Sequence, residues 1–223
     1  MFVPLYTADA LVLRTYKLGE ADRIVVFLTR DRGKKRGVAK GARRPRSRFT
    51  GALEPLTEVR VAYFEKERRE LVGLNYAETQ RSPLKLASQD ALGYVGYFAE
   101  LLDEWAQEAD ADDRLYRLGV SMLEALGEGV PVDALARYFE YWLLRLQGLY
   151  PESRGSLSDG AVAFLTAARS MSPQQVGTVP TAAPVLKELE HVHRALIATH
   201  LEKTLKSDRV LRDLRRHASL DSR

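Results

Sequence analysis

The chain has 223 residues, 45% of them hydrophobic and 29% charged, which is typical of a globular protein with a sizeable buried core. It has no cysteine, which excludes disulfides, thiolate metal sites and a cysteine nucleophile, and fits a cytosolic protein. The sequence contains no run of about 18 apolar residues and no basic start leading into an apolar run. We therefore predict neither a membrane-spanning helix nor a signal peptide.

The net charge of +4 is unevenly distributed along the chain. Residues 1–81 hold 18 Lys+Arg and 10 Asp+Glu, whereas residues 82–160 hold 6 and 14, and residues 161–223 hold 10 and 6. A basic first part, an acidic middle and a basic tail indicate separate surfaces with separate roles.

The first part of the chain has the pattern of β-structure. Short apolar and branched segments separated by turns predict five strands, at residues 10–16, 23–29, 35–40, 58–64 and 71–76. The last two are expected to pair across a charged hairpin. Five short strands in about 80 residues predict a small closed barrel, for which the OB-fold is the first choice and an SH3-like barrel the nearest competitor.

Beyond Ser82-Pro83 the hydrophobic period changes from two to 3.6 residues. Apolar stripes predict helices along the rest of the chain, at about residues 91–105, 115–126, 135–146, 161–168 and 185–205, with a last helix after residue 207. The fold class predicted is therefore α+β. We expect residues 1–81 to form the barrel domain and residues 82–223 an all-helical domain.

The most unusual segment is residues 30–48, which contains ten Lys or Arg residues and one acidic residue, Asp31. We interpret it as a basic strand followed by a basic loop. Most charge runs are solvated surface, but such a density of fixed positive charge favours a polyanion, because each cation can neutralise a phosphate and release counterions. The residues expected to bind phosphates are Lys34, Lys35, Arg36, Lys40, Arg43, Arg44, Arg46 and Arg48.

Other side chains extend this hypothesis. Arg14, Lys17 and Arg23 are candidates to enlarge the cationic surface. Aromatic side chains stack on bases in OB-folds, and the candidates are Phe49, Tyr16 and Tyr63, each with the alternative of a place in the barrel core. The basic tail has two interpretations, an ordinary helix C-terminal bias or a pocket for an acidic partner tail or a second strand. Its residues are Arg209, Arg212, Arg215 and Arg216.

No catalytic signature is present in the sequence. Phosphate-binding glycine loops, the nucleophile elbow and the zinc-protease motif are all missing, so we expect no enzyme activity. The acidic cluster at residues 110–113 is better explained as a helix cap than as a calcium loop. His191, His193 and His200 lack metal-ligand spacing, and we expect surface or satisfied buried histidines and no metal or other cofactor.

Several segments form a recognisable pattern: residues 11–16, 19–25, 28–29, Gly33, residues 39–44, Ser47, residues 51–55 and, late in the chain, residues 200–207. In their order and spacing they resemble the bacterial RecO family of recombination mediator and DNA repair proteins. The resemblance implies an N-terminal OB-fold and a C-terminal helical domain. Many members carry a four-cysteine zinc module, but the matching residues 147–155 contain no cysteine, so we predict a loop without zinc there.

The resemblance also implies a function and partners. Members bind single- and double-stranded DNA, anneal complementary strands, and help to load the RecA recombinase together with RecR. They also bind the acidic tail of the single-stranded-DNA-binding protein. The implied location is the bacterial cytoplasm, at the nucleoid. The alternative from another class is an RNA-binding accessory protein with an OB-like domain, which competition between single-stranded DNA and RNA would distinguish.

Overall fold

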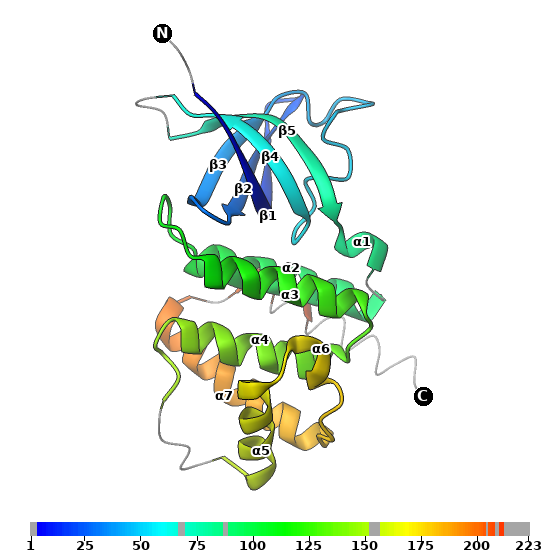
Figure 1. Ribbon diagram of the computed structural model, residues 1–223, viewed down its shortest axis with the longest axis vertical. Coiled ribbons are helices and arrows are strands. Elements are labelled where there is room, and N and C mark those ends of the chain that lie inside the picture. The colour runs from blue at the N-terminus through cyan, green and yellow to red at the C-terminus, as the bar shows by residue number, and fades with distance from the viewer. Residues whose placement is uncertain are drawn as a thin grey trace. The chain divides into compact units, whose positions relative to one another are not determined.

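The computed structural model describes residues 4–66, 70–86, 89–151, 157–203, 205–207 and 210–211. In these ranges a set of strands is followed by helices (Figure 1). The strands are β1 (Leu5–Leu18), β2 (Asp22–Thr29), β3 (Gly33–Ala39), β4 (Glu58–Phe64) and β5 (Val72–Arg81). The helices are α1 (Pro83–Leu86), α2 (Gln89–Trp105), α3 (Asp113–Gly127), α4 (Val132–Leu146), α5 (Asp159–Ser170), α6 (Pro173–Val176) and α7 (Ala183–Leu201).

The five strands close into a barrel in the order β1-β2-β3-β5-β4. All neighbouring pairs are antiparallel except β3 and β5, which run parallel over three residue pairs. A simple meander would put β3 beside β4, but here the 18-residue connection 40–57 carries the chain past β5. This is the Greek-key order of an OB-fold, and it confirms the predicted α+β class.

The interior of the barrel is filled by alternate side chains of every strand. Val25 and Phe27 of β2, Tyr63 of β4, and Val72 and Leu74 of β5 are among its buried residues. Because side chains alternate between the two faces of a strand, the residues between them point outwards. The prediction of β1 was too short, since this strand begins at Leu5 and continues through a bulge after Val12.

The chain divides into two compact units, and each is described by itself. The first joins Met1–Lys85 to Val95–Leu123, and the second joins Leu86–Tyr94 to Glu124–Arg223. The secondary structure changes at the expected place, because β5 ends at Arg81 and α1 begins at Pro83. The first unit nevertheless includes much of α2 and α3, so the division into domains at residue 82 stays a prediction.

In the first unit, the helical segments 95–105 and 113–123 cover one end of the barrel (Figure 1). Gly119 allows this close approach, because a side chain there would meet the ends of Leu11 and Leu102. At the same end Tyr116 donates a hydrogen bond of 3.2 Å to Glu58. At the opposite end of the barrel lie the turn between β1 and β2 and the start of the connection 40–57.

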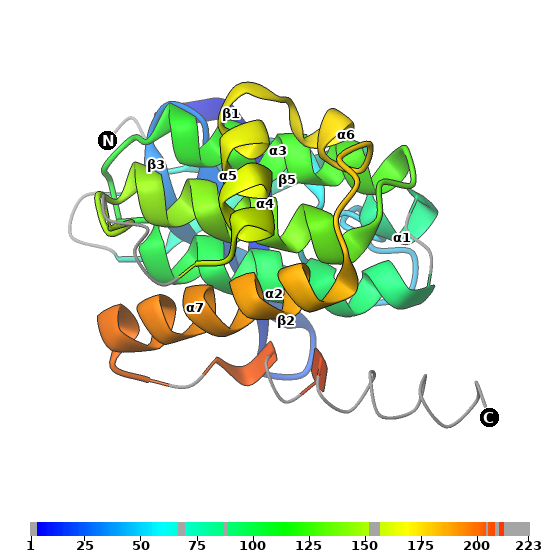
Figure 2. The same ribbon diagram turned by 90° about the horizontal axis from the view of Figure 1, so that it is seen from below.

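In the second unit, α4 packs against α7, α6 and α5. Figure 2 shows α7 running alongside α4 while α5 lies across it. The helix predicted at residues 185–205 ends earlier, at Leu201, where Glu202 adopts a left-handed conformation with φ of 52°. Within the described ranges, every helix is too short or too polar to span a bilayer.

Gly33 gives a first prediction. It has a φ of 67°, and a side chain there would collide with the backbone of Asp110. Replacing it with alanine adds backbone strain and this collision, so we expect Gly33→Ala to lower the free energy of unfolding by ~2 kcal/mol or more, measured by urea denaturation. Gly96→Ala is the control, because its added methyl group points into open space on α2. Equal stability of the two variants would contradict this account.

Candidate nucleic-acid interface

The basic loop, defined here as the connection 40–57 between β3 and β4, is fixed to the barrel by apolar anchors. Phe49, Ala52 and Leu53 belong to the barrel core and are at most 4% exposed. At the end of the loop, the main-chain NH of Leu56 donates to the carbonyl of Val12 at 2.7 Å. A loop with buried anchors at its centre and end holds its charged residues on a defined surface.

The start of the basic loop is tied to the turn between β1 and β2. Gly41, whose φ is 71°, donates its NH to the carboxylate of Asp22 at 2.8 Å. The guanidinium of Arg43 donates to the carbonyl of Gly19 at 2.8 Å, and its main-chain NH donates to Ala21 at 2.9 Å. These bonds place the two loops side by side at the end of the barrel away from α2 and α3.

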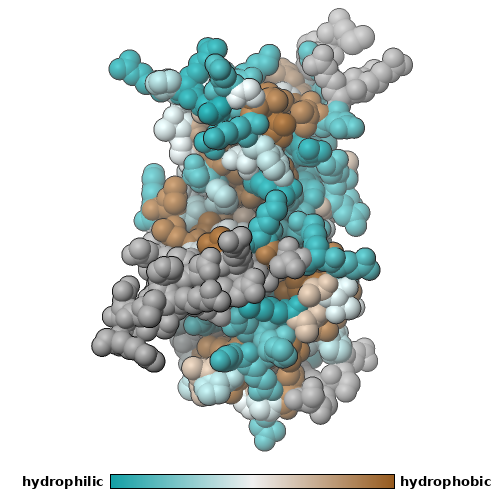
Figure 3. Space-filling model, turned by 180° about the vertical axis from the view of Figure 1, so that it is seen from behind, coloured by the Kyte–Doolittle hydropathy of each residue, from teal (hydrophilic) through white to brown (hydrophobic). Residues whose placement is uncertain are grey.

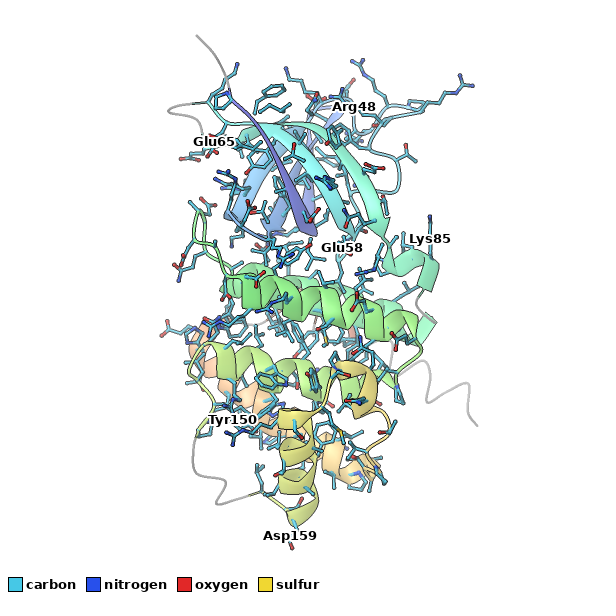
Figure 4. All side chains as sticks on the ribbon, in the orientation of Figure 1. Arg48, Glu58, Glu65, Lys85, Tyr150 and Asp159 are labelled. Atoms are coloured by element: carbon cyan, nitrogen blue, oxygen red, sulfur yellow. The ribbon has the colours of Figure 1, made fainter. Side chains whose placement is uncertain are left out.

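Five cations lie on the basic loop, and a sixth, Arg36, lies on the neighbouring strand β3. All six are exposed, and within the described residues none forms an ion pair with a carboxylate: Arg36, Lys40, Arg43, Arg44, Arg46 and Arg48. Figure 4 labels Arg48 at the loop end of the barrel, with Glu58 at the other end. Cations that no carboxylate neutralises keep their charge available for an external anion.

Lys34 and Lys35, also predicted to bind phosphates, are placed differently. Lys34 points towards α2, where its Nζ donates to the carbonyl of Asp103 at 2.6 Å and pairs with the Asp103 carboxylate at 3.3 Å. Lys35 pairs with Glu65 at 3.0 Å, and its side chain is 13% exposed. For these two lysines phosphate binding stays a prediction, and carboxylates of the same chain already pair with them.

The three additional cations also differ from one another. Arg14 pairs with Asp103 at 2.7 Å and lies over the ring of Tyr16, yet 40% of its side chain is exposed. Arg23 is half-buried and donates to the hydroxyl of Thr15 at 3.3 Å. Lys17 is exposed at the end of β1 and lies next to the turn that the basic loop contacts. Lys17 is therefore placed to extend the cationic surface, whereas Asp103 of α2 holds Arg14 at the helix-covered end of the barrel and Arg23 bonds across to β1.

Five residues form a row on the outer face of the barrel. Only one of them, Tyr16, was a candidate from the sequence. Strand pairing aligns Tyr16 with Ile24, Ile24 with Val38, Val38 with Gly73, and Gly73 with Phe64. Ile24, Val38, Gly73 and Phe64 each neighbour a core residue on their own strand and so point outwards, and Tyr16 lies on the same face because it pairs with Ile24. Tyr16 is 39% and Phe64 36% exposed. The alternation along each strand signalled these residues, but only the pairing register puts them in one row, which we call the outer row.

Two of the aromatic candidates for base stacking lie inside the barrel. Phe49 is 2% exposed and Tyr63 is fully buried, so both take the core alternative and the stacking prediction is wrong for them. Arg48 lies over the ring of Phe49 at 5.0 Å, which couples the exposed cation to the buried anchor. Tyr16 remains accessible for stacking.

The remaining candidates are the basic tail, the acidic cluster at residues 110–113 and the metal ligands considered in the sequence. Arg209, Arg212, Arg215 and Arg216 lie outside the described residues. Asp112 accepts hydrogen bonds from the main-chain NH groups of Arg114 and Leu115, both at 3.0 Å, which is the predicted helix cap. Among the described residues, no group of three His, Asp or Glu side chains is arranged to hold a metal ion.

His193 is the satisfied buried histidine that the sequence allowed. It is fully buried in the second unit, with Nδ1 3.0 Å from a carboxylate oxygen of Glu140 and Nε2 3.1 Å from the hydroxyl of Tyr150. Glu140 also accepts from Arg137 at 2.7 Å. Tyr150, from the segment without cysteines, is therefore held by ordinary contacts. Its neighbours 152–156 lie outside the described residues.

The fold and this surface define an OB-fold protein with an exposed cationic loop face. Comparison with protein families gives two matches, to the profile "Recombination protein O N terminal" over residues 1–83 and to "Recombination protein O C terminal" over residues 87–156. Three curated relatives are named DNA repair protein RecO. The one from Koribacter versatilis (strain Ellin345) is 42% identical over 66% of this chain and 61% of its own length.

The other two come from Anaeromyxobacter. The relative from strain K is 39% identical over 63% of this chain and 56% of its own length, and the one from strain Fw109-5 is 34% identical over 78% and 70%. The chain belongs to the RecO family, which confirms the resemblance drawn from the motifs. The first two alignments span about three fifths of the length of those relatives.

Asp103 gives a second prediction, because its 4% exposed carboxylate holds both Arg14 and Lys34. Asp103→Asn keeps the shape but removes the charge that both cations pair with. We expect the free energy of unfolding to fall by ~1–3 kcal/mol in urea denaturation. Glu65→Gln is the control, since its 39% exposed pair with Lys35 should contribute at most about 1 kcal/mol. A larger loss in the control would contradict the structural role assigned to Asp103.

Tyr63 gives a third prediction. Burial raises the pKa of its hydroxyl to about 12, and within the described residues this buried hydroxyl has no hydrogen-bond partner. An unfolded tyrosine ionises near pH ~10, so the unfolded state loses its proton first and stability falls between about pH 10 and about pH 12. Tyr63→Phe should be at least as stable at pH 7 and should lose less stability over this alkaline range, measured by denaturation at a series of pH values. Tyr16→Phe, at an exposed site, is the control and should leave the alkaline loss unchanged.

Proposed function

We propose that this protein is a non-catalytic DNA-binding recombination mediator that acts in DNA repair. It binds single- and double-stranded DNA through phosphate contacts and anneals complementary strands. The observation that carries the proposal is the set of six exposed cations on the basic loop and β3, which no carboxylate among the described residues pairs with. The names of the relatives, DNA repair protein RecO, support the same role.

The physical basis of annealing is the neutralisation of phosphates. Two complementary strands repel each other, and a protein that binds both with Lys and Arg screens this repulsion and releases counterions. Phosphate contacts leave the base edges free to find their partners. Arg44 and Arg46 are exposed in the basic loop, and no described contact commits either side chain to the protein itself. They are the side chains we expect to do most of this work.

Sequence-independent binding follows from the same geometry. The described surface offers flexible cations on a loop and on strand β3, and no helix bearing an ordered set of base-reading side chains. We therefore expect affinity to depend on salt and strand length more than on base sequence. The partners proposed are RecR and the single-stranded-DNA-binding protein, with loading of RecA as the outcome, and family membership is their support.

The direct experiment is annealing of two complementary oligonucleotides, followed by fluorescence, with and without the protein and without nucleotide or metal. Acceleration that fades as salt rises and survives a chelator is expected. Tight binding to single strands without acceleration would contradict annealing. A clear preference for RNA over DNA of equal length would favour the RNA-binding alternative instead.

The fourth prediction concerns the basic loop. Arg44→Gln with Arg46→Gln removes two cations from the interface, so single-stranded DNA of every sequence should bind more weakly. The slope of log affinity against log salt should become shallower by ~1.4, which is ~0.7 for each phosphate that the protein no longer neutralises. Titrations over a salt series measure both.

The matched control is Arg30→Gln with Arg117→Gln. These arginines both pair with Asp113 at 2.9 Å, at the end of the barrel covered by the helices. Each pair of substitutions lowers the net charge by two, so a difference between them reports position and not total charge. Equal salt slopes for the two variants would show that the basic loop is not the DNA surface.

A further inference from the structure

An open pocket of about 910 Å³ lies on the outer face of the barrel, beside the basic loop. Its lining includes Val38 of β3, Gly73 of β5 and Phe64 of β4. These are three consecutive members of the outer row. Figure 3 shows that hydrophobic residues reach the surface among hydrophilic ones in the part of the picture that holds the barrel.

The pocket exists because the outer row has a glycine between Val38 and Phe64. Gly73 pairs with Phe64 on one side and with Val38 on the other, so both neighbours project outwards and the glycine leaves a gap between them. A Cβ atom built on Gly73 meets nothing within 4 Å. The gap therefore has a backbone floor with an aromatic ring on one side and a branched aliphatic side chain on the other.

The rim of the pocket is charged. Lys40, Arg48 and Lys66 contribute three cations and Glu70 one carboxylate, a local excess of two positive charges. Lys40 and Arg48 are two of the six cations without a carboxylate partner. Apolar walls with cations at the rim suit a ligand that has a flat ring and an anionic group next to it.

We infer that this pocket binds an unstacked nucleobase of single-stranded DNA, with Phe64 as the stacking platform and Lys40 and Arg48 on the flanking phosphates. The inference rests on the proposed function and deepens it. The volume lies in the usual range of about 300–1,000 Å³ for small-molecule sites, so a nucleotide fits. A base within a duplex is stacked and paired and does not reach the pocket, so the pocket separates single strands from duplexes.

The test is to fill the pocket without changing any charge. Gly73 lies in a strand, where branched residues are favoured, and its added side chain meets no neighbour, so Gly73→Val should fold. We expect the variant to bind a single-stranded oligonucleotide about 5- to 100-fold more weakly, while its affinity for a duplex and its salt slope stay as in the wild type. The affinity of Gly73→Ala for the single strand should lie between those of the wild type and Gly73→Val. Gly96→Ala, another glycine with open space around it, should change nothing.

A second pair of variants tests the aromatic ring. Phe64→Ala should weaken the binding of single strands as Gly73→Val does. Phe64→Trp should keep the wild-type affinity, and the bound base should quench the fluorescence of the new tryptophan. An oligonucleotide of abasic sites keeps the phosphates and lacks bases, so the wild type and Gly73→Val should bind it equally.

The outcomes separate the pocket from the proposed function. Salt-sensitive binding of DNA by the wild type that Gly73→Val leaves unchanged, or weakens equally for single strands and duplexes, overturns the nucleobase pocket and leaves the phosphate interface standing. Failure of the wild type to bind any DNA overturns both. Loss confined to base-containing single strands supports the inference.

Discussion

The interface depends on the burial of three side chains of the basic loop in the barrel core. Four arginines between residues 43 and 48 repel one another, and a free loop of this composition would stay extended and mobile. Phe49, Ala52 and Leu53 oppose that tendency, because each is almost fully buried among strand residues. The hydrophobic effect thus supplies the free energy that keeps like charges close together on one face.

Carboxylates of the same chain neutralise some of the cations in the basic segment and leave others available. Charge counted along the chain makes Lys34 and Lys35 equivalent to the arginines that follow them. In the folded chain Asp103 and Glu65 pair with these two lysines, although they lie 69 and 30 residues away in sequence. Pairing of this kind cannot be predicted from composition, because it depends on which elements the fold brings together. The acidic middle of the chain is accordingly part structural support and not only solvated surface.

The elements themselves were predictable because local signals and the fold agree. Alternating apolar residues and the positions of glycine and proline located all five strands, and the helical period located most helices. The OB-fold implies that β3 lies beside β5, but the register of this pairing was not predictable, since a contact between residues 37–39 and 72–74 leaves no local trace in the sequence. The outer row follows from that register, so it too was missed. For Phe49 and Tyr63 the sequence left both stacking and a place in the core open, and burial in the barrel decides for the core.

The same strand register places the pocket beside the cations of the basic loop. The proposed annealing activity gives a physical reason for a base-binding pocket next to a phosphate-binding surface. Phosphate contacts alone would hold a strand equally well with its bases stacked, and stacked bases pair slowly with a second strand. One shallow site that binds an unstacked base would keep a short stretch of the strand unstacked. The free energy lost is about that of one base–base stack, and stacking on the protein offsets it. Because the site is open and only partly apolar, it can release that base to a complementary partner. Strong binding to many bases would block pairing, so a surface that binds phosphates widely and a base in few places suits the proposed mediator best.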